Sequence, residues 1–105
     1  MGERTENVQE YDLGQTLQEL AATIKQRRVA SPEQSYTARL LAEHEDRLYK
    51  KIVEEAFELG MAAKDGDHDH ICYEAADLLY HLLVALERTG VGTGELAGEL
   101  KARMK

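Results

Sequence analysis

The sequence is poor in cysteine and short of basic residues, and each shortage excludes a class of protein. The single cysteine, Cys72, cannot form an intrachain disulfide, which fits a reducing compartment. Thirteen lysines and arginines stand against twenty aspartates and glutamates, which gives a formal net charge of -7. A nucleic-acid-binding protein needs basic stripes that neutralise phosphates, so we expect no nucleic-acid partner. An anionic substrate must therefore be met by local cations, either bound ions or individual side chains.

Long apolar runs are also missing. No stretch of about eighteen apolar residues occurs, so no membrane span is expected. Residues 1–7 lack the apolar segment of a secretory signal, and we therefore expect a cytoplasmic protein. The length of 105 residues predicts one small domain at 12–105, preceded by a flexible segment at 1–11. A chain this short often associates with a second copy to bury more surface.

The spacing of apolar residues predicts an all-α protein, a small bundle of about five helices. The leucines and isoleucine between Leu13 and Ile24 share one helical face, and Asp12 can cap that helix. Gly66 is a natural left-handed cap at the end of the third helix. We expect helices over about 13–29, 35–43, 46–64 and 68–88, and a last short helix that is capped by Thr93 or Gly94.

Two pairs of carboxylates with i,i+3 spacing lie on consecutive predicted helices. Glu55 and Glu58 share one face of the third helix, and Glu74 and Asp77 share one face of the fourth. The short turn between the helices makes them pack antiparallel. That arrangement can bring the two pairs together.

The setting of the second pair makes it informative. The segment Ile71–Leu86 is almost wholly apolar apart from Glu74, Asp77 and His81, so we expect it to be buried, with Cys72 packed inside. Buried carboxylates are costly unless they are paired or bind a metal. A hard divalent cation removes the repulsion among four acids, and all-oxygen ligation suits Mg²⁺ or Mn²⁺. Solvated acidic faces are the alternative, above all for the pair on the third helix.

Hydrolysis of a polyphosphate is the chemistry that such a site supports best. Magnesium bridges phosphate oxygens to carboxylates, neutralises developing charge and can activate water. Lys51, one turn before Glu55, could contact a phosphate oxygen or form an ion pair with Glu55. Glu54 could accept a proton from water or be an ordinary surface glutamate. His81, one turn after Asp77, could support a metal ligand, although a hydrogen-bonded core histidine is the more common case.

Two other classes compete with a polyphosphate hydrolase. A ferritin-like di-iron protein requires Glu-x-x-His on two helices, and that sequence does not occur here. A helical adaptor whose acids are incidental would not be stabilised by added metal. A calcium loop beginning at Asp65 is excluded, because His70 and Ala76 stand where the loop needs glycine and an acid.

Several segments together resemble a known family over about residues 13–103. They are Ser35-Tyr36-Thr37-x-x-Leu40, Glu45-Asp46-Arg47, Lys50-Lys51-x-x-Glu54-Glu55-x-x-Glu58, Ala62-Ala63-Lys64-x-Gly66-Asp67 and the run from Tyr73 to Val84. They resemble the phosphoribosyl-ATP pyrophosphatases of histidine biosynthesis. The Glu-Glu-x-x-Glu and Glu-x-x-Asp elements alone are shared more widely, with MazG-like nucleoside triphosphate pyrophosphatases and dimeric dUTPases. The Ser-Tyr-Thr element and the Tyr73–His81 run make the narrower match specific.

The resemblance implies magnesium-dependent hydrolysis of 1-(5-phosphoribosyl)-ATP to phosphoribosyl-AMP and pyrophosphate. It also implies a homodimer in which a four-helix core is completed across the interface. We expect the apolar helix at 71–86 to need that second copy, because three short companions cannot cover it. A MazG-like pyrophosphatase of (deoxy)nucleoside triphosphates is the alternative function.

The resemblance also implies roles for individual residues. The metal ligands would be Glu55, Glu58, Glu74 and Asp77. The residues beside them, with catalytic roles, would be Glu54 and Lys51. The residues near the substrate would be Ser35, Tyr36 and Thr37. From the chemistry of the side chains we add Arg39, a nearby cation that could meet the second phosphate, and Lys51, which could contact a phosphate oxygen. Two positions depart from the family's usual residues: Gly60 replaces a bulkier apolar residue, and His44 stands where glycine is common.

Overall fold

The computed structural model describes residues 8–104 and confirms the all-α prediction, with no strand in that range. The elements are α1 (Leu13–Gln26), the 3₁₀ turn η1 (Arg27–Val29), α2 (Tyr36–Ala42), α3 (Glu45–Asp65), α4 (His68–Thr89) and α5 (Thr93–Ala102). One predicted helix, 13–29, is divided, because its last turn tightens into η1. The segment predicted to be flexible, 1–11, lies mostly outside the described residues. None of the helices in the described part of the chain is long and apolar enough to cross a membrane.

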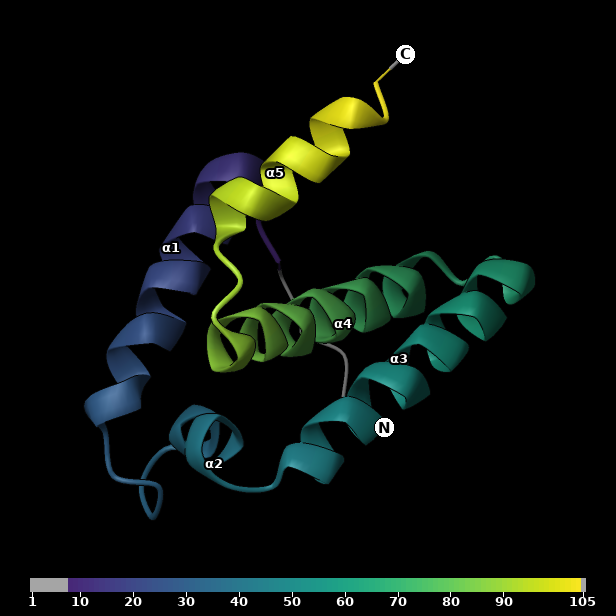
Figure 1. Ribbon diagram of the computed structural model, residues 1–105. Coiled ribbons are helices and arrows are strands. Elements are labelled where there is room, and N and C mark those ends of the chain that lie inside the picture. The colour runs from purple at the N-terminus through teal and green to yellow at the C-terminus, as the bar shows by residue number, and fades with distance from the viewer. Residues whose placement is uncertain (1–7, 105) are drawn as a thin grey trace.

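The two longest helices, α3 and α4, lie side by side and antiparallel (Figure 1). Their connection is short because Gly66 ends α3 with a φ of 71°, a left-handed conformation that glycine adopts without strain. Asp67 then caps α4, since its carboxylate accepts a hydrogen bond from the backbone N–H of His70 at 3.3 Å. This turn sets the register in which the acids of the two helices meet.

A second left-handed residue stands between α2 and α3. His44 has a φ of 52°, and it is the one residue other than glycine with a positive φ among those described. A side chain in that conformation is strained by contact of its Cβ with the backbone. The frequency of glycine at this position in the resembling family therefore has a conformational cause.

The hydrophobic core lies where α1 and α2 pack against the C-terminal half of α4. Its buried members come from four helices: Ile24, Leu40, Leu41, Leu48, Leu83 and Val84. Helix α1 begins with the predicted Asp12 cap, whose carboxylate accepts a hydrogen bond from the N–H of Gln15 at 2.8 Å. This core lies at the end of the α3–α4 pair that is away from the connecting turn.

One expectation about the α3–α4 pair was wrong. Cys72 is exposed rather than buried, because a residue two positions before the inward-facing Glu74 points to nearly the opposite side of the helix. Apolar side chains of α4 such as Ile71, Leu78 and Leu82 are only partly buried, so the expectation that α4 needs further cover stays a prediction. Helix α3 is more open still, because Tyr49, Val53, Phe57 and Met61 are exposed. These four residues, spaced by four, form a stripe that we call the outer face of α3.

Arg88 of α4 holds the end of α2 in place. Its guanidinium donates to the carbonyl oxygens of Leu40 and Glu43, each at 2.7 Å, and lies 3.9 Å from the carboxylate of Glu45. Carbonyls in the last turn of a helix lack helical partners, so an outside donor satisfies them. The contact joins α2, the start of α3 and α4 at one point.

We predict that Arg88→Ala lowers the free energy of unfolding by about 2–3 kcal/mol, because two carbonyls lose a charged donor. Urea denaturation measures the change. Arg88→Lys is the matched control and should recover only part of the loss, since one ammonium cannot reproduce the planar fork of a guanidinium. A change for Arg88→Ala within about 0.5 kcal/mol of zero would contradict a supporting role.

Candidate active site

The carboxylates of α3 and α4 meet in the middle of the helix pair. Glu58 of α3 and Glu74 of α4 come together with His70, and one ligand atom from each lies within 4.8 Å of the other two. Glu74 is 1% exposed, the most buried of the acids. The i,i+3 spacing on consecutive helices therefore predicted the convergence of Glu58 and Glu74. His70 was missed, although its spacing from Glu74, one turn along the same helix, could have indicated it.

The position of Glu74 makes its negative charge costly. Burial raises the pKa of the Glu74 carboxyl, a hydrogen bond with Glu58 raises it further, and the contact with His70 opposes the rise. His70 Nε2 lies 3.1 Å from Glu74 Oε2. Two carboxylates that share a hydrogen bond need either a proton or a cation between them. The cluster is therefore suited to hold a positive ion.

Glu55 is buried beside the cluster and pairs with a histidine. His81 Nδ1 lies 2.8 Å from Glu55 Oε1. Burial raises the pKa of the Glu55 carboxyl, and the negative charge of Asp77 adds to the rise, while His81 and Lys51 oppose it. Of the four predicted ligands, Glu58 and Glu74 therefore meet at ligand distance, whereas Glu55 and Asp77 lie outside that group, and the charge of Asp77 acts on Glu55.

The two residues predicted for catalysis differ in their surroundings. Lys51 is half-buried, and its charge acts on the Glu55 carboxylate, as the one-turn spacing on α3 predicted. Glu54 is exposed, and its carboxylate lies 3.9 Å from the Lys50 amine across one turn of α3. Lys51 is therefore placed beside the acids, whereas Glu54 lies on their solvent-facing flank.

Two residues of the Ser-Tyr-Thr element reach α4. The Tyr36 hydroxyl lies 3.1 Å from His81 Nε2, and the Thr37 hydroxyl is hydrogen-bonded to that of Tyr80. The rings of Tyr36 and Tyr80 are stacked with centroids 6.4 Å apart. The Ser-Tyr-Thr element, which is predicted to meet the substrate, is thereby linked to His81, the hydrogen-bond partner of Glu55.

The other two residues predicted near the substrate have partners inside the fold. The Ser35 hydroxyl accepts from the backbone N–H of Ala38 at 3.1 Å and caps α2. The Arg39 guanidinium donates to the carbonyl oxygen of Pro32 at 2.8 Å, and its carbon lies 5.7 Å from the centre of the Tyr36 ring. These contacts position the start of α2, and the roles of Ser35 and Arg39 toward substrate stay predictions.

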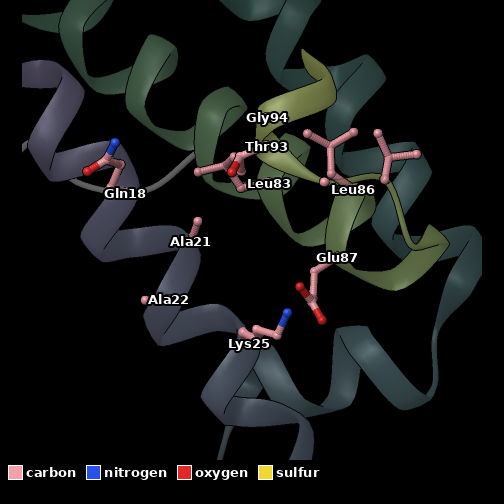
Figure 2. A pocket seen from close by; sticks show the side chains of 11 residues that line it. Gln18, Ala21, Ala22, Lys25, Leu83, Leu86, Glu87, Thr93 and Gly94 are labelled. Atoms are coloured by element: carbon pink, nitrogen blue, oxygen red, sulfur yellow. The ribbon is translucent and has the colours of Figure 1, made fainter. Parts of the chain in front are cut away.

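A hollow of about 490 Å³ lies elsewhere, between α1, the C-terminal part of α4 and the start of α5 (Figure 2). Lys25 and Glu87 face it with their charged ends, and Leu83 and Leu86 give it an apolar wall. Leu83 is nine residues beyond Glu74, about 14 Å along α4. The hollow is thus separate from the acid cluster and contributes none of the predicted site residues.

The buried carboxyl of Glu74 predicts how stability depends on pH when no metal is added. Because its pKa is raised in the folded protein, the unfolded chain loses this proton first as pH rises above about 4.3. The contribution of Glu74 to the free energy of unfolding is complete below that pH, and it is lost as the pH rises through the pKa of Glu74 in the folded protein. We therefore expect the free energy of unfolding of Glu74→Gln to exceed that of the wild type increasingly from pH 4.5 to 7.5.

Urea denaturation in the presence of a chelator, repeated across this pH range, measures the difference. The matched control is Glu33→Gln, which makes the same chemical change at an exposed position before α2 and should follow the wild-type curve. A Glu74→Gln curve parallel to that of the wild type would contradict the destabilising burial of Glu74.

Comparisons with known proteins identify the family of this chain. Residues 17–104, which include every site residue discussed above, match the family described as phosphoribosyl-ATP pyrophosphohydrolase. The chain is 47% identical over 90 residues to the phosphoribosyl-ATP pyrophosphatase of Rhizobium rhizogenes, with 86% of each chain covered. It is 49% identical over 88 residues to that of Methylibium petroleiphilum, with 84% of this chain and 73% of the relative covered.

A third relative is longer. The chain is 49% identical over 77 residues to a histidine biosynthesis bifunctional protein of Wolinella succinogenes, and the match covers 73% of this chain and 34% of that protein. The predicted family resemblance is confirmed by these matches. With its acid cluster on α3 and α4, the chain belongs to the phosphoribosyl-ATP pyrophosphohydrolase family of enzymes.

Proposed function

We propose that this protein hydrolyses phosphoribosyl-ATP to phosphoribosyl-AMP and pyrophosphate in the second step of histidine biosynthesis, in the cytoplasm. The observation that carries the proposal is the meeting of Glu58 and Glu74 from two helices at ligand distance, in a chain that belongs to this family. A MazG-like pyrophosphatase would use the same acids. The family match over residues 17–104 favours the phosphoribosyl substrate.

The residues present fit a divalent cation, which we propose to be Mg²⁺. Glu55, Glu58, Glu74 and Asp77 would hold it, with His70 beside them. One ligand atom each of Glu58, Glu74 and His70 lies within 4.8 Å of the other two, and the buried carboxylates would gain a compensating charge from the ion. When bound, such an ion neutralises charge that develops on phosphate oxygens and makes water a better nucleophile.

Side chains at the edge of the cluster would bind the phosphate and accept the proton. The Lys51 ammonium, already close enough to act on Glu55, supplies a positive charge for a phosphate oxygen. Glu54 has an exposed carboxylate on the same helix and takes the proton from the attacking water. Thr37 and Tyr36 bring α2 against α4, which places the substrate-facing segment next to the acids.

Measuring pyrophosphate release from phosphoribosyl-ATP, ATP, dUTP and dCTP tests this proposal. We expect the highest kcat/KM with phosphoribosyl-ATP and Mg²⁺, lower but measurable activity with Mn²⁺, and none after chelation. Faster hydrolysis of dUTP or dCTP would assign the protein to the MazG-like alternative. Equal rates with and without a chelator would overturn the metal-dependent mechanism.

His70 gives a prediction about the identity of the ion. Imidazole suits manganese better than magnesium, so His70→Ala should weaken Mn²⁺ binding about tenfold and Mg²⁺ binding less. Isothermal titration calorimetry measures both dissociation constants. His68→Ala, an identical change at an exposed position two residues earlier on α4, is the control and should bind both ions as the wild type does. Equal behaviour of the two variants would remove His70 from the site.

We also propose that the enzyme is a homodimer in which a second copy covers the outer face of α3. Its four exposed side chains, Tyr49, Val53, Phe57 and Met61, form a continuous apolar stripe on the helix that carries Glu55 and Glu58. A stripe on one helix can pair with the same stripe of a second copy about a two-fold axis. Such pairing would complete a four-helix core from the α3–α4 pairs of both chains.

A further inference from the structure

His81 is enclosed by contacts from three helices. Its side chain is 5% exposed on α4. Nδ1 lies 2.8 Å from Glu55 Oε1 of α3 and 3.0 Å from the backbone oxygen of Asp77, while Nε2 lies 3.1 Å from the hydroxyl of Tyr36 on α2. The Tyr80 ring meets it nearly edge-on, at 4.8 Å between centroids and 76° between planes. Polar partners on both nitrogens and aromatic rings on its sides hold the imidazole in one orientation.

The partners determine which nitrogen carries the proton. A backbone carbonyl only accepts hydrogen bonds, so the 3.0 Å contact with Asp77 requires a proton on Nδ1. That N–H also points to the carboxylate of Glu55. In the neutral ring Nε2 is then an acceptor, and the Tyr36 hydroxyl must be the donor. In this neutral tautomer the hydrogen bonds run in one direction, from Tyr36 through His81 to Glu55.

We propose that His81 is a positioning residue that fixes the Glu55 carboxylate in the cation site and ties it to Tyr36 of α2. This inference rests on the proposed function, because Glu55 is one of the proposed ligands. A partner that orients a ligating carboxylate typically contributes tenfold to a hundredfold to metal affinity. Through its second nitrogen the same imidazole also contacts Tyr36 at the start of α2. His81 therefore connects the segment proposed to face the substrate with the proposed metal ligand Glu55.

The geometry resembles a hydroxyl–imidazole–carboxylate chain, which in other enzymes activates a nucleophile. Here burial raises the pKa of the Tyr36 phenol, which disfavours the phenolate that such a mechanism needs. The Tyr36 hydroxyl also has the imidazole of a core histidine as its partner rather than an open substrate position. The chain therefore positions groups and does not supply an attacking oxygen.

The tautomer can be read from the wild-type protein by ¹⁵N NMR of labelled histidine, which requires no variant to fold. The sequence has four histidines, and Tyr36→Phe identifies His81 because only its Nε2 loses a donor. We expect that histidine to carry a proton on Nδ1, with and without Mg²⁺. A proton on Nε2 without one on Nδ1, or no histidine resonance that moves in Tyr36→Phe, would overturn the proposal.

Two isosteric variants separate positioning from packing. The amide nitrogen of His81→Asn replaces Nδ1 and can still donate to Glu55, whereas the amide of His81→Gln replaces Nε2 and reaches only Tyr36. We expect Mn²⁺ to bind His81→Asn within about threefold of wild type and His81→Gln at least about tenfold more weakly. A residue that only fills space would weaken both variants alike, in proportion to lost stability.

Glu55→Gln separates failure of this inference from failure of the proposed function. It should weaken Mn²⁺ binding at least about tenfold if Glu55 is a ligand. Wild-type affinity in Glu55→Gln would refute the proposed ligand set. Weak binding in Glu55→Gln together with equal affinities in His81→Asn and His81→Gln would refute the role of His81 alone.

Discussion

Glu74→Gln should lower the kcat for phosphoribosyl-ATP hydrolysis at least about a hundredfold at saturating magnesium, with unchanged helix content. Glu74 is the most buried acid of the cluster and touches both Glu58 and His70. An amide oxygen in its place carries no charge, so it holds a divalent cation far less strongly than a carboxylate. Steady-state pyrophosphate release measures kcat, and circular dichroism checks the fold.

The same substitution should leave the protein at least as stable as the wild type when a chelator is present. It removes one charge from a group of carboxylates at low exposure while keeping the shape of the side chain. Asp77→Asn should likewise reduce activity without unfolding the chain. Glu33→Gln, at an exposed position away from the cluster, should match the wild type in both tests. Near-wild-type turnover in Glu74→Gln would remove it from the site.

Phe57→Glu should convert the proposed homodimer to a monomer. Phe57 is 68% exposed in the middle of the outer face of α3, between Val53 and Met61. A carboxylate there would be buried without a partner in the dimer, and a second copy would bring an identical charge opposite it. We expect the dissociation constant of the dimer to rise on the order of a hundredfold or more.

Sedimentation velocity at micromolar concentration distinguishes the two states. The control is Val29→Glu, an apolar-to-acidic change at a 93% exposed position in η1, which should stay dimeric. A wild-type protein that sediments as a monomer would contradict the homodimer. Equal dissociation by both variants would show that net charge, rather than the outer face of α3, controls association.

Much of this fold could be predicted because its signals are local. The helical period of the apolar residues fixes where helices form, Asp12 and Gly66 mark ends through their own side chain or backbone, and i,i+3 spacing fixes which acids share a face. These features depend on neighbours within one or two turns. The convergence of Glu58 with Glu74 followed from them once the turn between α3 and α4 was known to be short.

The features that were missed depend on how distant segments meet. Periodicity indicates which face of a helix is buried but not which residues it contacts. The contact of Glu55 with His81 could therefore not be predicted, nor could that of Tyr36 with the same imidazole, 45 residues away in the sequence. The contacts of Arg88 with the end of α2 are of the same kind. The predicted burial of Cys72 was wrong for a different reason. The residues around it are nearly all apolar, so the sequence did not show that one side of α4 faces outward.

The proposed position of the cation is the central claim, and anomalous diffraction from crystals grown with Mn²⁺ tests it most directly. We predict a manganese peak between the carboxylates of Glu58 and Glu74, within ligand distance of both, and its absence in crystals of Glu74→Gln. The account would be contradicted if manganese were absent from these two carboxylates and bound elsewhere, for example in the hollow between α1 and α4.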